Sequence, residues 1–316
     1  MKIVVLDGFT LNPGDLTWDS LENFGECHIY ERSTRNEVLQ RAIDAEIVIT
    51  NKVVLDKGIL DQLPNLKYIG VSATGYNIVD IKAAKEKGVT VTNVPGYGSS
   101  AVAQHTFALI LALSNRLTEN AQSVNKGKWS KNKDWCFWDF PIMELSGKTI
   151  GIVGFGEIGR QVAKIAQGFG MKVISFHKHP ERDKMPGVIF VDLETLFSDS
   201  DVISLHCPLT EENKGFIDEA LLGKMKKSAF LINTSRGPLI NEKDLALCLT
   251  HKKITGAGLD VLSEEPPQAN HPLIGLENCI VTPHNAWAAK ESRQRLMNIL
   301  VNNIEKYMDG SPVNVI

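Results

Sequence analysis

The sequence predicts an α/β protein with two domains, each built on a parallel sheet. The chain has 316 residues, whereas single hydrophobic cores stop growing at about 250–300 residues. Short runs rich in β-branched residues alternate with longer helical patterns, which is typical of parallel strands joined by helical crossovers. The alternation falls into two series, and a long apolar helical pattern separates them.

The first series starts at the N-terminus. In "MKIVVLDGFT" the apolar run is only four residues long before Asp7, so we interpret it as a strand and not as a signal peptide. Helical candidates such as "IVDIKAAKEKG" lie between the apolar runs. The strands predicted for this series are 2–6, 46–50, 66–72 and 89–92.

The second series is longer and starts with "TIGIVG". Its strands are predicted at 149–154, 172–176, 201–207, 229–234, 254–261 and 279–283. A last helical pattern at 287–309 has no strand after it, and we expect it to fold back onto the first series.

The segment between the series has two parts. "SSAVAQHTFALILALSNR" (99–116) begins with serines that suit an N-cap and is apolar almost all the way round. We expect this helix to be buried between domains or between subunits. The polar stretch that follows holds three of the five tryptophans, and exposed aromatic side chains in a loop indicate an interface or a ligand.

The composition excludes several classes of function. With 34 basic and 37 acidic residues the net charge is near zero, so nothing indicates nucleic-acid binding. No stretch approaches the ~18 consecutive apolar residues of a membrane span. The cysteines form no CxxC pair, which argues against a disulfide framework and a metal site and favours a cytoplasmic protein. They are Cys27, Cys136, Cys207, Cys248 and Cys279.

A glycine motif, "GFGEIG", follows the first strand of the second series and opens a helical pattern. In that context the first glycine makes a tight turn and the second lets the backbone approach a pyrophosphate. The third lets the helix pack on the strand, with its N-terminus facing the anion. The motif therefore predicts a dinucleotide cofactor bound at Gly154, Gly156, Glu157, Ile158 and Gly159.

The choice between NAD(H) and NADP(H) stays open at this stage. An Asp or Glu is expected about 20 residues after the motif, where it would bind the adenosine ribose of NAD. His177 stands there instead, followed by Lys178, His179 and Arg182. These side chains would not repel a 2′-phosphate, so NADP(H) is also compatible. A solvated basic loop without influence on the cofactor is the alternative.

Three chemically useful side chains follow later strands, where ligands of open α/β sheets bind. Arg236 follows "AFLINTS", Glu265 follows "GAGLDVLSE", and His284 follows "CIVTP". A guanidinium can bind the carboxylate and polarise the ketone of a 2-oxo acid. An imidazole can give the ketone oxygen a proton and take it back, and a carboxylate can orient the ring. Singly, the three could be a surface ion pair, a loop charge and a core histidine.

The order of GxGxxG, "NTSRG", "GLDV…EEP" and "TPH" resembles the D-isomer-specific 2-hydroxyacid dehydrogenase family over essentially the whole chain. The resemblance implies two Rossmann-like domains. A flavodoxin-like substrate domain (1–98 and 286–316) would hold an inserted NAD(P)-binding domain (99–285). It also implies a homodimer around the helix at 99–116, and a catalytic role for Arg236, Glu265 and His284.

Further site residues are implied only by this resemblance. The backbone in "SATGYN" would bind the substrate carboxylate, and other residues would line the nicotinamide or the adenosine. Trp135 or Trp138 would reach the partner's active site. The residues are Ala73, Thr74 and Gly75 with Trp138 for substrate, Thr106 and Asp260 for nicotinamide, and Cys207, Pro208, Thr234 and Ser235 for adenosine.

The substrate is the least determined feature. "WCFWDFPIMELSGKTIGIVGFGEIG" is similar to the glycerate dehydrogenase branch, which implies reduction of hydroxypyruvate to D-glycerate. Glyoxylate, phosphohydroxypyruvate and a bulkier 2-oxo acid stay open. One departure from the family pattern is Gln104, where an acid usually precedes the nicotinamide-side threonine. A dinucleotide-sensing protein without turnover is the alternative from another class.

Overall fold

The computed structural model describes residues 1–316 and divides them into two compact units. Unit 1 comprises Met1–Gly98 and Ala288–Ile316, and unit 2 comprises Ser99–Trp287. The boundary on the C-terminal side lies after Trp287, whereas the sequence placed it after residue 285. Each unit is organised around one sheet whose named strands pair in parallel, so the predicted α/β class with parallel sheets is confirmed.

Unit 1 contains a five-stranded sheet in the order β2-β1-β3-β4-β5, the order of flavodoxin-like folds. Its central strands are short apolar runs buried on both faces, as parallel sheets require. Strand β2 was not predicted, because its sequence "ECHI" is polar. It lies at the edge of the sheet. The strands are β1 (Lys2–Val5), β2 (Glu26–Ile29), β3 (Ile47–Thr50), β4 (Tyr68–Val71) and β5 (Thr90–Thr92).

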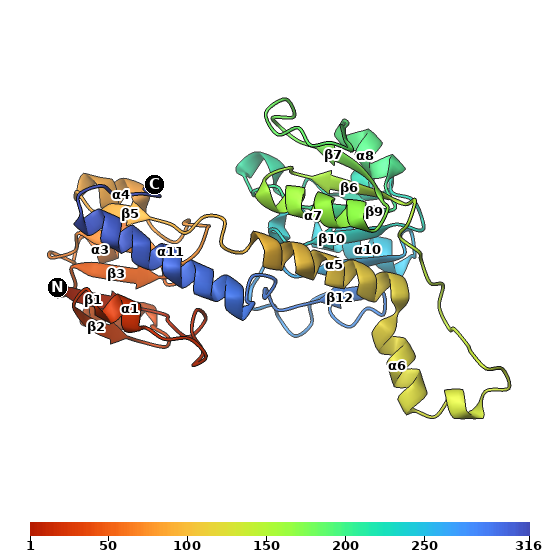
Figure 1. The fold of residues 1–316 in the computed structure, drawn as a ribbon, viewed down its shortest axis with the longest axis horizontal. Coiled ribbons are helices and arrows are strands. Elements are labelled where there is room, and N and C mark those ends of the chain that lie inside the picture. The colour runs from red at the N-terminus through yellow and green to blue at the C-terminus, as the bar shows by residue number, and fades with distance from the viewer. The chain divides into compact units, whose positions relative to one another are not determined.

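Helices cover both faces of this sheet. The long C-terminal helix packs on β4, where Gly70 leaves room for Leu300 and the Tyr68 and Tyr307 rings lie 4.7 Å apart. Figure 1 draws this helix in blue along the sheet of unit 1. The helices of unit 1 are α1 (Asp19–Glu22), α2 (Arg35–Ala42), α3 (Lys57–Leu60), α4 (Ile81–Glu86) and α11 (Lys290–Met308).

Unit 2 contains a seven-stranded sheet in the order β12-β11-β10-β9-β6-β7-β8. The strand order reverses between β6 and β9, as in the Rossmann fold, where a dinucleotide binds at this point. The sequence missed the short edge strand β8. The strands are β6 (Thr149–Val153), β7 (Lys172–Phe176), β8 (Val188–Phe190), β9 (Val202–Leu205), β10 (Phe230–Asn233), β11 (Gly256–Leu259) and β12 (Cys279–Val281).

Helices α5 and α7 share one face of the second sheet, and they lie side by side in Figure 1. Gly258 and Gly256 bring α5 close to β11, since a Cβ on either would meet Leu109 or Leu113. The helices of unit 2 are α5 (Ser99–Asn115), α6 (Leu117–Asn125), α7 (Glu157–Gly168), α8 (Leu193–Asp199), α9 (Glu219–Leu222) and α10 (Glu242–Thr250), with 3₁₀ turns at Trp129–Lys131, Glu211–Asn213 and Gly237–Leu239.

An arm at 116–148 leaves the body of unit 2 between α5 and β6, and Figure 1 shows it extending away from the sheet. Arg116 separates α6 from α5 with a left-handed backbone, φ +51°. The tryptophans of the arm are exposed, Trp135 to 87% and Trp138 to 67%. Such exposure of large aromatic side chains indicates a surface that another molecule covers.

Candidate active site

Most of the predicted site residues of unit 2 lie at one edge of its sheet; Thr106 lies on α5 and Trp138 in the arm. Because all seven strands run parallel, their carboxyl ends meet at the same edge, and this is where ligands of open α/β sheets bind. The glycine motif follows β6, and His177 follows β7 directly. Cys207 and Pro208 follow β9, Thr234, Ser235 and Arg236 follow β10, Asp260 and Glu265 follow β11, and His284 follows β12.

The glycine motif forms a tight cradle between β6 and α7. Gly154 has φ +93°, and a Cβ there would lie 2.5 Å from the amide nitrogen of Cys207. A Cβ on Gly159 would lie 2.4 Å from the carbonyl oxygen of Gly154. Both positions therefore require glycine for close backbone packing. A Cβ on Gly156, in contrast, would meet nothing within 4 Å, so this glycine borders open space.

The cradle fits a dinucleotide. The open space at Gly156 lies at the N-terminus of α7, where Gly156 is the N-cap and provides no side-chain hydrogen bond. The first N–H groups of a helix have no partner within the helix and attract a phosphate. Nearby, His206 follows β9, and its buried Nδ1 atom has no hydrogen-bond partner. Burial lowers the pKa of His206 to about 3, so this ring adds no charge.

The turn after β10 is held by its own side chains. The buried Asn233 accepts the Ser235 N–H at 3.0 Å and donates to the Arg236 carbonyl at 2.9 Å. The Ser235 hydroxyl donates to the Cys207 carbonyl at 2.6 Å, which ties this turn to the turn after β9. The Thr234 and Thr106 hydroxyls are hydrogen-bonded at 3.1 Å. The structure thus brings together four of the residues predicted to contact the cofactor.

Arg236 lies next to the loop that carries Glu265. A Cβ on Gly237 would lie 2.0 Å from the carbonyl carbon of Leu262, so only glycine allows this approach of the two loops. The Arg236 side chain is exposed, and its Nη1 donates to the Ser235 carbonyl at 2.7 Å. The remaining guanidinium donors can bind a carboxylate in the planar geometry that arginine offers.

His284 and Glu265 form a hydrogen-bonded pair. The distance from His284 Nδ1 to Glu265 Oε2 is 2.5 Å. The other carboxylate oxygen of Glu265 accepts the Leu262 N–H at 3.0 Å, which orients the carboxylate. Since Nδ1 faces the carboxylate, Nε2 is the ring atom left to exchange a proton with a ligand. The geometry is that of a general acid or base with an orienting carboxylate.

The buried carboxylate of Asp260 organises the backbone around His284. It accepts the Thr282 hydroxyl at 2.6 Å and the N–H groups of Asn285 and Ala286 at 3.0 and 2.9 Å. The Asp260 carbonyl accepts the His284 N–H at 2.8 Å. These bonds hold His284 at φ +50°, a left-handed conformation in which histidine occurs more often than most residues. Sequence reasoning placed Asp260 near the nicotinamide and did not foresee these bonds.

The predicted substrate residues Ala73, Thr74 and Gly75 belong to unit 1, in the loop after β4. The Ala73 carbonyl accepts the Val94 N–H at 3.0 Å, and the Thr74 hydroxyl donates to the Val94 carbonyl at 3.0 Å. The Asn93 side chain donates to the Thr74 carbonyl at 2.7 Å. The loop is therefore anchored through its carbonyls and its hydroxyl, and its N–H groups at Thr74 and Gly75 remain for a ligand.

A cavity of about 480 Å³ also lies in unit 1, beside the carboxyl ends of β1 and β3. Its walls carry both signs of charge. Arg35 pairs with Asp56 at 2.5 Å, and Arg32 pairs with Glu31 at 3.3 Å.

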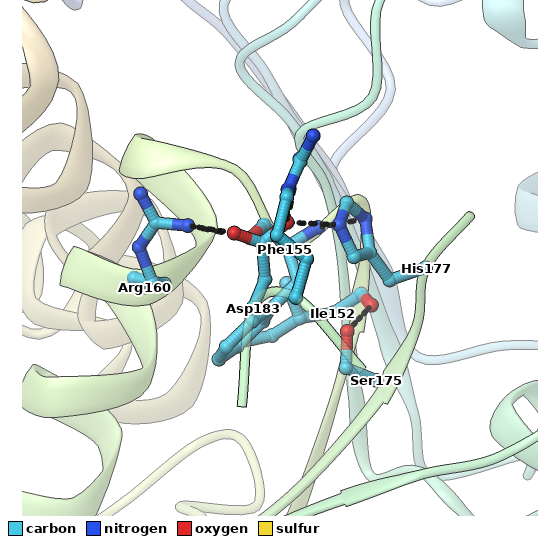
Figure 2. Close-up of polar contacts among 7 residues, drawn as sticks. Ile152, Phe155, Arg160, Ser175, His177 and Asp183 are labelled. Carbon is cyan, nitrogen blue, oxygen red and sulfur yellow. Dashed lines mark hydrogen bonds and ion pairs between the residues drawn. The ribbon is translucent and has the colours of Figure 1, made fainter. Parts of the chain in front are cut away.

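The basic segment after β7 differs most from the expectation, and Figure 2 shows its contacts. His177 Nδ1 accepts the Phe155 N–H at 3.1 Å, and its Nε2 lies 2.8 Å from an oxygen of Asp183. Arg160 also reaches Asp183, at 3.0 Å. Sequence reasoning missed Asp183, because it looked for an acid only at the end of the strand.

The structure contains neither a metal-binding cluster nor a membrane-spanning helix. No group of three or more His, Cys, Asp or Glu side chains has a geometry that could hold a metal ion. None of the helices is both long enough and apolar enough to cross a membrane.

Comparisons with known proteins show the family to which the fold belongs. Residues 107–286 match the family model described as D-isomer specific 2-hydroxyacid dehydrogenase, NAD binding domain. The hydroxypyruvate reductase of Blautia hydrogenotrophica is 49% identical, with 100% of this chain and 99% of that protein covered. The glycerate dehydrogenase of Methylorubrum extorquens is 43% identical, with 100% and 98% covered.

Among solved structures, an acyclic imino acid reductase in complex with NADPH and D-Arg matches with a TM-score of 0.88. It is 35% identical, and the match covers 100% of both chains. The two-unit architecture is thus shared with an enzyme that binds a nicotinamide dinucleotide.

Proposed function

The chain belongs to the D-isomer specific 2-hydroxyacid dehydrogenases and is an NAD-dependent enzyme, and from this premise we propose that it interconverts hydroxypyruvate and D-glycerate. The nicotinamide, when bound, supplies or accepts the hydride. One observation carries the roles of the protein's own residues: the 2.5 Å bond between His284 Nδ1 and Glu265 Oε2, at the sheet edge where the glycine cradle opens.

His284 acts as the general acid and base. In reduction its Nε2 gives a proton to the ketone oxygen, and in oxidation it takes the proton back from the hydroxyl. Glu265 keeps the ring oriented, because its carboxylate accepts a hydrogen bond from the Nδ1–H group in both directions. Asp260 is a positioning residue, since it acts through the backbone of the segment that carries His284.

Arg236 binds the substrate carboxylate. Arg236 offers a planar pair of donors, which suits two carboxylate oxygens or one carboxylate oxygen together with the ketone oxygen. Thr74 and Gly75 offer backbone N–H groups in an anchored loop, and such groups are common anion ligands. Donors of either kind favour 2-oxo acids over simple ketones.

Two relatives support hydroxypyruvate as the substrate. The hydroxypyruvate reductase and the glycerate dehydrogenase are 49% and 43% identical to this chain over nearly the full length. Two further relatives support a small substrate: glyoxylate reductases of Thermococcus litoralis and Thermofilum pendens are 42% and 38% identical. The preference among small 2-oxo acids depends on side chains that line the pocket, which differ among related enzymes of the same chemistry.

The experiment that tests this proposal follows the absorbance of NADH with four acids: hydroxypyruvate, glyoxylate, pyruvate and phosphohydroxypyruvate. We expect the highest kcat/KM for hydroxypyruvate, with glyoxylate at least about tenfold lower, since glyoxylate lacks the CH₂OH group and the loss of even one methylene contact is worth about 10- to 200-fold. A higher kcat/KM for another acid would show that this acid, and not hydroxypyruvate, is the preferred substrate. Clear NADH binding with no turnover of any acid would favour a sensing protein.

We also propose that the protein is a homodimer. Two surfaces of unit 2 support this: the exposed aromatic arm, and a stripe of small or polar exposed residues along α5 at Gln104, Ala108 and Asn115. A second copy that covers the arm would remove Trp135 and Trp138 from water.

The five unpaired cysteines favour a reducing compartment, the cytoplasm.

The dimer is tested by sedimentation velocity, where we expect a particle of twice the 34.9 kDa chain. Trp138→Ala should raise KM for hydroxypyruvate about tenfold, the scale of losing an apolar contact to a substrate. Trp135→Ala is the matched control, since it removes the same ring from the same arm. A monomer at micromolar concentration would contradict the proposal. A larger rise in KM for Trp135→Ala than for Trp138→Ala would show that Trp135 makes the contact with the substrate.

A further inference from the structure

The loop that carries Glu265 is exposed along most of its length. It runs between two buried residues, Leu262 and Leu273, and residues 263–270 are all exposed. An exposed segment gains little order from packing. The Glu265 carboxylate must nevertheless stay at hydrogen-bond distance from His284 Nδ1. Contacts from other parts of unit 2 are therefore needed to fix the path of this loop.

Glu242 contacts the loop at both of its ends. It is the first residue of α10, and its side chain is only 16% exposed. Its Oε1 atom accepts the Ser263 N–H at 2.7 Å, and its Oε2 atom lies 3.2 Å from His271 Nε2. One carboxylate thus holds the residue that starts the exposed segment and the residue that follows it.

Both partners of Glu242 are hydrogen-bond donors. A backbone N–H can only donate, so His271 Nδ1 is the acceptor of the Leu273 N–H at 3.4 Å. The proton of the neutral His271 ring therefore lies on Nε2 and is donated to Glu242. Two donors require two acceptor oxygens on one side chain, which a carboxylate provides. A glutamine has one acceptor oxygen and would lose one of the two bonds.

The end of the loop held by Glu242 is also the end that orients Glu265. The Leu262 N–H donates to Glu265 Oε1 at 3.0 Å, and the next residue, Ser263, is bound by Glu242. A shift of the Ser263 backbone would move the Leu262 N–H, because the two amide groups are joined through one Cα atom. The other oxygen of Glu265 is bound to His284. A continuous series of hydrogen bonds thus leads from α10 to the imidazole.

We propose that Glu242 and His271 are positioning residues for the reaction, which act through Glu265 by fixing the loop at 262–273. An acid in the first turn of α10 would also stabilise the helix through its dipole, and Asp244 lies in the same turn. The test must separate these two roles. The inference rests on the proposed roles of His284 and Glu265, and it holds for whichever 2-oxo acid is reduced.

Glu242→Gln is expected to lower kcat by about 10- to 100-fold, the scale of a small misplacement of a catalytic group. The dissociation constant for NADH should stay near the wild-type value, since the glycine cradle lies on another loop. Asp244→Asn is the matched control, because it removes the same charge from the same turn while its carboxylate binds the Glu219 N–H. An equal loss of kcat in this control would contradict the inference.

The conservative variants at both positions test the bonds themselves. His271→Gln keeps an N–H donor for Glu242 and should retain more kcat than His271→Leu, which keeps none. Glu242→Asp keeps both acceptor oxygens on a shorter side chain and should lose less kcat than Glu242→Gln. It takes the place of Glu242→Gln in the later measurements if that variant is unfolded. Equal kcat for His271→Gln and His271→Leu would remove His271 from the proposal.

A double-mutant cycle tests whether Glu242 acts through Glu265. In a Glu265→Gln background, Glu242→Gln should cause little further loss of kcat, because the series of bonds to His284 is already interrupted. Losses that multiply would show that the two residues act independently and would overturn the inference.

Hydrogen exchange of the protein without substrate gives a readout that needs no turnover. The backbone amides of residues 262–273 should exchange faster in Glu242→Gln than in the wild type and in Asp244→Asn. Unchanged exchange would contradict the inference. If His284→Ala kept a normal kcat, the proposed mechanism would fail together with the role of Glu242 in it. If His284→Ala were inactive and Glu242→Gln fully active, only the present inference would fail.

Discussion

His284→Ala is expected to lower kcat by about 10²- to 10⁴-fold, the range for loss of a general acid or base. The reason is the position of the ring, whose Nδ1 is bound to Glu265 at 2.5 Å and whose Nε2 is left for the substrate. The dissociation constant for NADH should change little, since the glycine cradle lies on another loop. Steady-state kinetics with hydroxypyruvate and NADH titration measure the two quantities.

His284→Asn separates chemistry from backbone conformation. His284 has φ +50°, and asparagine tolerates this left-handed conformation better than alanine does. The Asn variant should therefore be as inactive as the Ala variant while its thermal stability stays closer to that of the wild type. A normal kcat in either variant would show that His284 is not the general acid or base.

Arg236→Ala is expected to lower kcat/KM for hydroxypyruvate by about 10²- to 10³-fold, the scale for loss of a preorganised donor in an active site. Most of the change should appear as a higher KM, because the guanidinium binds the carboxylate before and during the reaction. Thermal stability should stay within about 0.5 kcal/mol of the wild type, as for other exposed side chains. Kinetics and thermal melts of the same preparation give both values.

Arg236→Lys is the matched control for charge. Lysine keeps the positive charge but cannot present the planar pair of donors, so the variant should lie between alanine and the wild type. If Arg236→Ala lowered the melting temperature and left KM unchanged, Arg236 would be a structural residue of the turn after β10.

The fold and the glycine cradle were largely predictable from local patterns. Apolar runs such as 46–50 and 149–154 indicated buried parallel strands, and the spacing of Gly154, Gly156 and Gly159 indicated a phosphate cradle. Two of the four edge strands, β2 and β8, were not predicted. β2 has the polar sequence ECHI and lacks the apolar run that marks a central strand. β8 is apolar, but it is only three residues long and half-buried.

The residues that position the site were not visible in the sequence. Asp260 binds N–H groups 25 and 26 residues further along the chain. Asn233 and Gly237 have roles that depend on which loops approach each other. Their types are ordinary for turns, so no local signal distinguishes a turn residue from one that holds a catalytic segment.

By itself the sequence determined the class of fold, the dinucleotide cradle and the three groups proposed for the chemistry, because each depends on residue type and short spacing along the chain. Only the tertiary structure decided how these groups are held and which side chains meet after β7. Asp183 is an ordinary loop residue in the sequence. Its position beside His177 and Arg160 follows from the path of the chain, and electrostatic effects depend on distances in space.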